Sequence, residues 1–237
     1  VKLGVNITKW LKVDYNMRYT REDFRRPANL TDNLYDQIAR QGWPVLPLYD
    51  PNGYYYSAPS PALGMAEGGK DTSQRDLMNH KISLTIEPIK NWITHIDFNY
   101  QIDNTVRHWD SQVVYNHDVT GKPYVYGSGN SNVHEDEKKE DYMNFQAYSE
   151  YSLTHNFHVM AGFQAEQLKQ LQFGLQRNGI INPSQPEIDI TTGLGPDGLP
   201  ITPSTNGSRN QWQTAGFFGR LNYNYDERYL IEANVRT

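Results

Sequence analysis

The fold is decided by the stretch LKVDYNMRYT, residues 11–20, in which apolar and polar side chains alternate without exception. Amphipathic helices repeat their apolar positions every three or four residues, so this alternation excludes a helix. Successive side chains of a strand point to opposite faces of its sheet. Residues 11–20 are therefore predicted to form a strand with one apolar face and one polar face.

Seven other segments show the same alternation. They are residues 2–8, 79–87, 92–103, 142–153, 157–166, 212–225 and 229–236. Short turns join these strands in pairs, and long loops at residues 23–73, 104–141 and 167–211 separate the pairs. Tight turns at one end and long loops at the other are typical of a transmembrane β-barrel. A short helix is expected within the first loop, at residues 31–41.

The predicted strands have about nine to twelve residues, as tilted membrane strands do. Aromatic residues stand beside every short turn, as in the aromatic girdle of a barrel. They are Trp10, Trp92, Tyr151 with Phe157, and Tyr225 with Tyr229. Because backbone groups facing lipid find no water to bond with, the strands must close into a ring. The sequence thus predicts an all-β fold, an antiparallel transmembrane β-barrel segment with long extracellular loops.

Composition narrows the function classes. The chain of 237 residues has a mean hydropathy of −0.76 and no run of about 20 apolar residues, so no membrane helix is expected. It contains no cysteine, which excludes disulfides, thiolate metal sites and cysteine catalysis. The net charge of −5 gives no electrostatic basis for binding nucleic acid.

The order of turns and loops predicts how much of a barrel the chain forms. Four short turns and three long loops put both chain ends on the long-loop side. Complete bacterial barrels have both ends on the short-turn side, so we expect an interior part of a larger barrel. Val1 already lies in a strand-like segment, and no signal peptide is visible.

Two hairpins resemble a known family. Residues 216–230, GFFGRLNYNYDERYL, resemble a signature hairpin of the SusC/RagA-type TonB-dependent transporters of the Bacteroidetes. Residues 10–16, WLKVDYN, with the YTRE stretch at residues 19–22, are similar to the first barrel strands of that family. In the family the strand after the signature hairpin ends in Arg-x-Asp-Gly-Ser-Ser, whereas this chain stops at Thr237.

The resemblance implies a 22-stranded barrel with an N-terminal plug in the bacterial outer membrane. Residues 1–237 would be part of one β-barrel domain, without the plug and the remaining strands. Such proteins import oligosaccharides or peptides, work with a SusD-like surface lipoprotein and receive energy from the TonB complex. For the parent protein we therefore expect nutrient import, with oligosaccharides as the favoured substrates. The barrel is expected to be surrounded by outer-membrane lipid and to have no enzymatic activity.

Candidate ligand contacts are of two kinds. Aromatic rings of the loops could stack on sugar rings. They are Trp43, Tyr54, Tyr55, Tyr56, Trp109, Tyr115, Tyr124 and Tyr126. The alternative is that these rings pack the loops against one another or against a partner. Charged residues on the polar strand faces are expected to line the lumen: Arg18, Asp97, Glu150, Glu166 and Arg220.

No cofactor, metal or catalytic residue is predicted. Residues 193–198, GLGPDG, match a dinucleotide fingerprint formally, but they follow no strand and contain a proline. His155 and His158 lack a third ligand. The charged run at residues 135–141 is mixed in sign and is expected to be solvated at the end of the second loop. A calcium site built from its carboxylates is the alternative, although their spacing follows no calcium-loop motif.

Two hypotheses from other classes remain. A soluble all-β carbohydrate-binding or adhesin domain would also show alternation. However, soluble sandwiches seldom contain three loops of about forty residues. A glycan-cleaving enzyme is the weaker alternative, since Asp97 and Asp103 have no evident acid/base context. Solubility distinguishes the first two hypotheses, because a barrel wall requires detergent or lipid.

Overall fold

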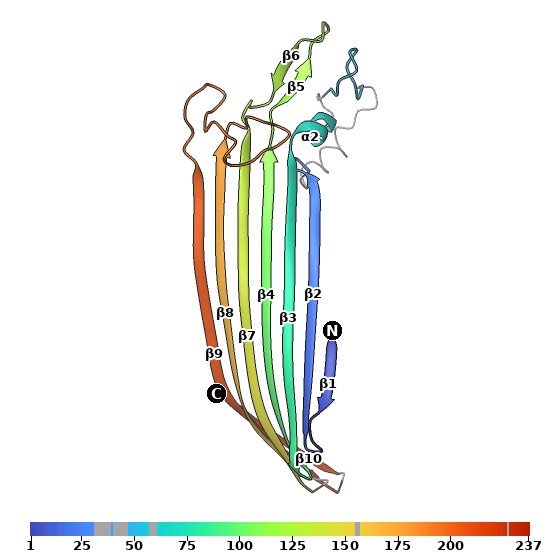
Figure 1. The fold of residues 1–237 in the computed structure, drawn as a ribbon. Coiled ribbons are helices and arrows are strands. Elements are labelled where there is room, and N and C mark those ends of the chain that lie inside the picture. The colour runs from blue at the N-terminus through green and yellow to red at the C-terminus, as the bar shows by residue number, and fades with distance from the viewer. Residues whose placement is uncertain (31–38, 40–46, 57–60, 155–156, 227) are drawn as a thin grey trace.

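A computed structural model describes residues 1–30, 39, 47–56, 61–154, 157–226 and 228–237. It shows one antiparallel sheet of eight strands in the order β1-β2-β3-β4-β7-β8-β9-β10, so chain neighbours are sheet neighbours (Figure 1). The strands are β1 (Lys2–Asn6), β2 (Leu11–Pro27), β3 (Lys70–Ile89), β4 (Trp92–Ser111), β7 (Asn132–Thr154), β8 (Phe157–Asn178), β9 (Ser204–Tyr225) and β10 (Tyr229–Arg236). The all-β antiparallel prediction is confirmed, and the sheet is open between β1 and β10.

The tight turns lie together at one end of the sheet and the long loops at the other (Figure 1). The loop end carries the short helix α2 (Ala62–Glu67) and a second sheet formed by β5 (Val114–His117) and β6 (Pro123–Tyr126). No helix in the described part of the chain is long and apolar enough to cross a membrane. The helix expected at residues 31–41 falls almost wholly outside the described residues, as does Trp43.

The six strands from β2 to β9 in the large sheet are longer than the sequence predicted, whereas β10 matches its predicted range and β1 is shorter. The predicted loop boundaries were wrong, because β3 begins at Lys70, β4 continues to Ser111 and β8 continues to Asn178. In most of these extensions polar residues occupy both faces, so the alternation disappears; in β8 it continues at Leu171, Phe173 and Leu175. The backbone hydrogen bonds of a ladder do not depend on an apolar face, and β4 pairs with β7 without a break from Trp92 to Ser111.

The register aligns the apolar side chains of neighbouring strands on one face. One cross-strand row runs Val13, Leu84, Ile96, Ala147, Phe163 and Phe217. Rings on this face are exposed, with Phe98 39% and Phe217 65% accessible. The buried apolar residues of the described chain are Leu63, Val114 and Val133, all near the loop end. Among the residues that the structure describes, no second layer covers the apolar face, whereas the sheets of a soluble sandwich cover each other.

The apolar residues form a band that crosses the strands obliquely. On β4 the band extends from Trp92 to Ile102, after which Asn104 begins the polar extension. On β8 and β9 its continuous run ends at Ala165 and Ala215, which pair in the row of Phe98; on β8, Leu171, Phe173 and Leu175 follow on the same face after Gln167 and Lys169. The margin therefore shifts by four residues across the sheet. Such a slant is the pattern expected for strands tilted against a flat lipid layer.

A small core ties the loop end to the sheet. Gly69 adopts a φ of 104°, and a Cβ there would lie 2.1 Å from the carbonyl oxygen of Asp110. The Asp110 carboxylate accepts a hydrogen bond from the Lys70 backbone N–H at 3.1 Å, and its side chain is buried. Glycine is thus required where the chain enters β3.

Candidate functional site

The polar face of the sheet contains all five residues predicted to line a lumen. Asp97 lies in one row with Gln146 and Gln164, and Glu150 lies in another with Met160 and Arg220. Arg18 and Glu166 occupy rows of the same face. Strand alternation thus gathers these side chains on the side opposite the apolar band.

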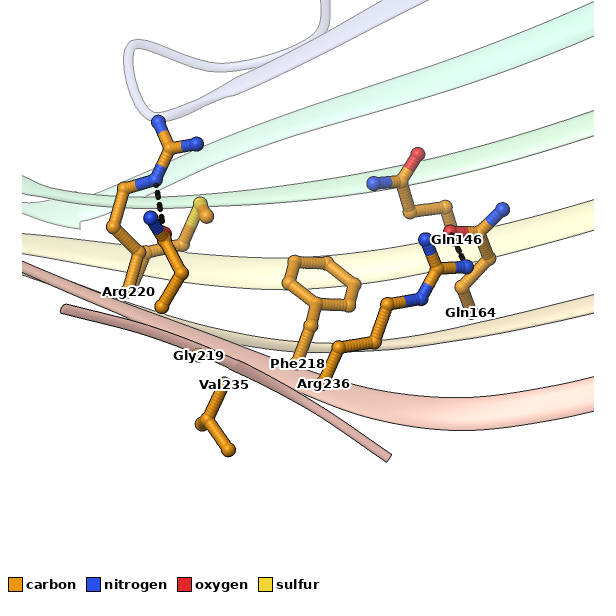
Figure 2. A pocket seen from close by; sticks show the side chains of 9 residues that line it. Gln146, Gln164, Phe218, Gly219, Arg220, Val235 and Arg236 are labelled. Atoms are coloured by element: carbon orange, nitrogen blue, oxygen red, sulfur yellow. Dashed lines mark hydrogen bonds between the residues drawn. The ribbon is translucent and has the colours of Figure 1, made fainter.

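A hollow of about 420 Å³ opens on this polar face between β8, β9 and β10 (Figure 2). Arg220 and Arg236 project to the same side with Phe218 between them, whereas Val235 points the opposite way. The Arg220 Nε donates to Asn234 Oδ1 at 2.9 Å. The Arg236 guanidinium lies 3.5 Å from Gln164 Oε1.

The hollow presents groups that are suited to binding a ligand. Guanidinium groups bind carboxylates in two-point contacts, and the amides of Gln146 and Gln164 donate and accept hydrogen bonds. The sequence identified Arg220 but missed Arg236, Gln164 and Gln146. The signal was present, because all three occupy polar-face positions of the alternation.

Two aromatic rings flank a glycine on the same face. Gly162 pairs with Tyr148 on one side and Phe218 on the other, and those ring centroids are 6.4 Å apart. A Cβ on Gly162 would lie 2.5 Å from Phe218 Cζ and 2.5 Å from Tyr148 Cβ. The missing side chain lets the rings approach and gives the hollow one aromatic wall.

We expect Gly162→Ala to destabilise the sheet by about 1.5 kcal/mol, because the added methyl overpacks the site between the rings. The matched control is Gly207→Ala in β9, where a Cβ meets only a carbonyl oxygen at 3.8 Å. Urea unfolding in detergent micelles measures both variants. Equal stability of the two variants would contradict the close approach of the rings.

The polar face of the strand extensions is internally ion-paired. The Asp71 carboxylate accepts hydrogen bonds from Arg26 Nε at 2.9 Å and from Arg107 Nε at 2.8 Å. Its side chain is 4% exposed. The Arg107 hydrogen bond, followed by that of Arg26, lowers the pKa of Asp71 against the opposing effect of burial. Farther along, Arg75 Nη2 pairs with Asp103 Oδ2 at 2.6 Å.

The lowered pKa of Asp71 predicts acid sensitivity at the loop end. Its ionised form is favoured in the folded state, so its contribution is complete above the ordinary value of 3.8 and is lost as pH falls through the lowered folded pKa. We expect hydrogen-exchange protection of residues 70–73 and 105–109 to be constant from about pH 7 to pH 5 and to fall below about pH 4. A loss near pH 6 would instead implicate a histidine.

The loop aromatics divide into groups. Tyr54 stacks on His117 with centroids 3.8 Å apart, and Asn52 Nδ2 donates to the Asp118 carbonyl at 3.0 Å. The segment at residues 47–56 is thereby joined to the β5–β6 hairpin. Tyr55 packs beside Tyr49 at 5.0 Å. Packing of loop against loop therefore accounts for part of this set.

The hairpin displays three of the predicted rings. Tyr124 and Tyr126 stand on one face of β6, and Tyr115 stands on the opposite face of the hairpin. Each is 44–49% exposed. Tyr56, another of the predicted residues, donates a backbone hydrogen bond from its N–H to the Leu48 carbonyl oxygen at 3.0 Å. Trp109 belongs to β4 and not to a loop. Its ring stacks on His134 with centroids 3.5 Å apart, and the Arg107 guanidinium lies over the ring 5.9 Å from its centroid.

One group of side chains could hold a metal ion. Ligand atoms of His108, Glu135 and Glu187 lie within 4.8 Å of one another. The sequence did not suggest this group, because Glu187 comes from the loop between β8 and β9. His108 and Glu135 also form a hydrogen bond with each other.

Comparison with known proteins relates the chain to a transporter by fold. No protein-family model and no curated protein matches it. The structure of the RagAB peptide transporter superposes with a TM-score of 0.67 at 17% identity. The structure of the RagAB peptide importer in the 'open-open' state superposes with a TM-score of 0.65 at 18% identity. Its structure in the 'closed-closed' state superposes with a TM-score of 0.64 at 17% identity.

Each match covers 99% of this chain but only 26% of the matched chain. The chain thus spans about a quarter of the length of these proteins. At such identities the likeness establishes the fold: the eight-stranded sheet corresponds to part of the wall of a β-barrel transporter.

Proposed function

We propose that this chain forms part of the wall of a SusC-like, TonB-dependent importer in the bacterial outer membrane. The uncovered apolar band carries the proposal, since an exposed band of this extent would be unstable in water and is stable in lipid. The band margin at Ile102 and Ala165 follows the slant of a membrane-embedded wall. The opposite face then borders a water-filled passage, as the charged rows around Asp97 and Glu150 require.

The family-level part of the proposal rests on the hairpin at residues 216–230 and on the likeness to the RagAB structures. A SusD-like surface lipoprotein would act at the loop end and the TonB complex at the tight-turn end. The wall performs no bond-making chemistry; it binds and guides the solute.

We propose oligosaccharides as the substrate class, because Tyr115, Tyr124 and Tyr126 expose ring faces at the loop end. Peptides are the second candidate. Arg220 and Arg236 offer guanidinium groups to a terminal carboxylate, and the transporter of like fold is a peptide transporter.

Cysteine labelling tests the orientation of the wall, because the chain has no cysteine of its own. In protein residing in native outer membranes, Asn144→Cys on the polar face should react with a water-soluble maleimide. Phe145→Cys on the apolar face should react only with a lipid-soluble reagent. Equal reaction of both positions with the water-soluble reagent would overturn the proposal.

Uptake by cells that make the protein, compared with cells lacking its gene, tests the substrate class. Radiolabelled oligosaccharides should enter only the first strain. Gene-dependent uptake of peptides alone would favour the second candidate, and gene-independent uptake of both would argue against import.

A further inference from the structure

A basic hollow lies on the apolar side of the wall, just beyond the margin of the apolar band. It has a volume of about 370 Å³ and is lined by side chains of β7, β8 and β9. Lys139 lies in one row with Leu171 and Arg209, and Asp141 lies in the next with Lys169 and Gln211. These six side chains share the face of Phe145 and Phe163, so the hollow opens toward the side that the proposed function assigns to lipid.

The hollow has an excess of positive charge. It holds three cations and one carboxylate, and the nearest opposite charges, Lys139 Nζ and Asp141 Oδ2, are 3.8 Å apart. Within the described parts of the chain, neither Lys169 nor Arg209 has an ion-pair partner. On the polar face at the same height, by contrast, Lys138 is paired with Glu140 at 2.9 Å.

The height of the hollow matches the headgroup layer of a membrane. Lys169 stands four residues beyond Ala165, where the continuous apolar run of β8 ends; Leu171, Phe173 and Leu175 follow farther along the same face. At about 3.3 Å per residue this is roughly 13 Å along the strand, and about 10 Å above the hydrocarbon edge for a strand tilted by about 40°. Headgroups extend about 5–8 Å from that edge. Flexible lysine and arginine side chains span the remaining distance.

We propose that Lys169, Arg209 and Lys139 bind the phosphate of a phosphorylated glycolipid in the outer leaflet. Three converging cations at headgroup height complement a phosphate, and arginine and lysine are the side chains that bind this group. Leu171, between Lys139 and Arg209 in the same row, provides apolar contact for the lipid body. The inference rests on the proposed function only in assigning this face to lipid and the long loops to the outside.

The test uses the protein purified from its native membrane in a mild detergent and placed in nanodiscs of neutral lipid. Monophosphoryl lipid A is titrated in, with its dephosphorylated form as the comparison. The wild type should prefer the phosphorylated form, and Lys169→Gln/Arg209→Gln should bind it on the order of tenfold more weakly. The matched control, Lys81→Gln/Lys138→Gln, removes two cations from the polar face and should leave the affinity unchanged.

Three outcomes overturn the inference: equal binding of both lipid forms, equal loss in the control variant, or full displacement of the lipid by millimolar inorganic phosphate. The last would mark a site for a free anion only. If the proposed function itself were wrong, the wild-type protein would be absent from the outer-membrane fraction. Wild type and variants recovered from that fraction in equal amounts, with unchanged lipid binding, disprove this inference alone.

Discussion

Phe98→Arg is expected to destabilise the membrane-embedded protein by about 2–4 kcal/mol, the largest effect of any single substitution considered. Phe98 lies midway along the apolar band of β4, between Ile96 and Tyr100, and it is 39% exposed, with no covering layer in the described part of the chain. An arginine there would place a charge in the hydrocarbon core, where no solvent or counter-charge compensates it. Unfolding by urea or guanidinium in lipid vesicles measures the change.

The matched control is Asn99→Arg, one residue farther along the same strand. Asn99 belongs to the polar face, in the row of Asn144 and Glu166. This variant should remain within about 0.5 kcal/mol of the wild type. If Phe98→Arg were tolerated as well as Asn99→Arg, the apolar face would not contact lipid. If Asn99→Arg were the more harmful, the assignment of faces would be reversed.

Asp71→Ala is expected to destabilise the loop end by about 2 kcal/mol, because it removes the shared acceptor of two arginines. The carboxylate is almost fully buried, and Arg107 contributes both Nε and Nη2 to it at 2.8 and 2.9 Å. Without it, Arg26 and Arg107 face each other unpaired. Hydrogen exchange should show the loss at the ends of β2, β3 and β4.

Asp118→Ala serves as the comparison. Asp118 caps an exposed turn, where it accepts hydrogen bonds from Thr120 and from the Lys122 backbone N–H at 2.9 Å. Its removal should affect only that turn. The ion-pair interpretation fails if Asp71→Ala leaves exchange at residues 70–73 unchanged, or if the conservative Asp71→Asn restores full protection.

Alternating apolar and polar side chains predict a strand well when one face contacts lipid and the other contacts water. The pattern weakens where both faces of the strand contact water. The stretch at residues 11–20 predicted its strand, its two faces and its tight turn because lipid and water impose opposite demands. Beyond Asp103, residues 104–111 have polar side chains on both faces, and their pairing with β7 depends on backbone hydrogen bonds that the residue types do not encode. The extension of β4 was missed for that reason, whereas in β8 the alternation of Leu171, Phe173 and Leu175 was overlooked.

The candidate site shows the same limit. Arg220 was identified because its charge stands within an alternating strand, but its neighbour Arg236 comes from the next strand, β10, and is placed by register. The stacking of Tyr54 on His117 joins segments separated by more than sixty residues, which no local pattern predicts. Trp109 was predicted as a loop residue and belongs to β4 because the strand extension was missed.

The unbroken pairing of β4 with β7 constrains how a gene for such a wall can diverge. Inserting or deleting one codon within β4 would turn every later side chain of the strand to the opposite face, exchanging residues such as Phe98 and Asn99. Viable length changes inside the ladder must therefore come in twos. Odd changes are confined to the loops and to the two irregular places beside the tight turns, between Ile86 and Ile89 and between Ser152 and Thr154.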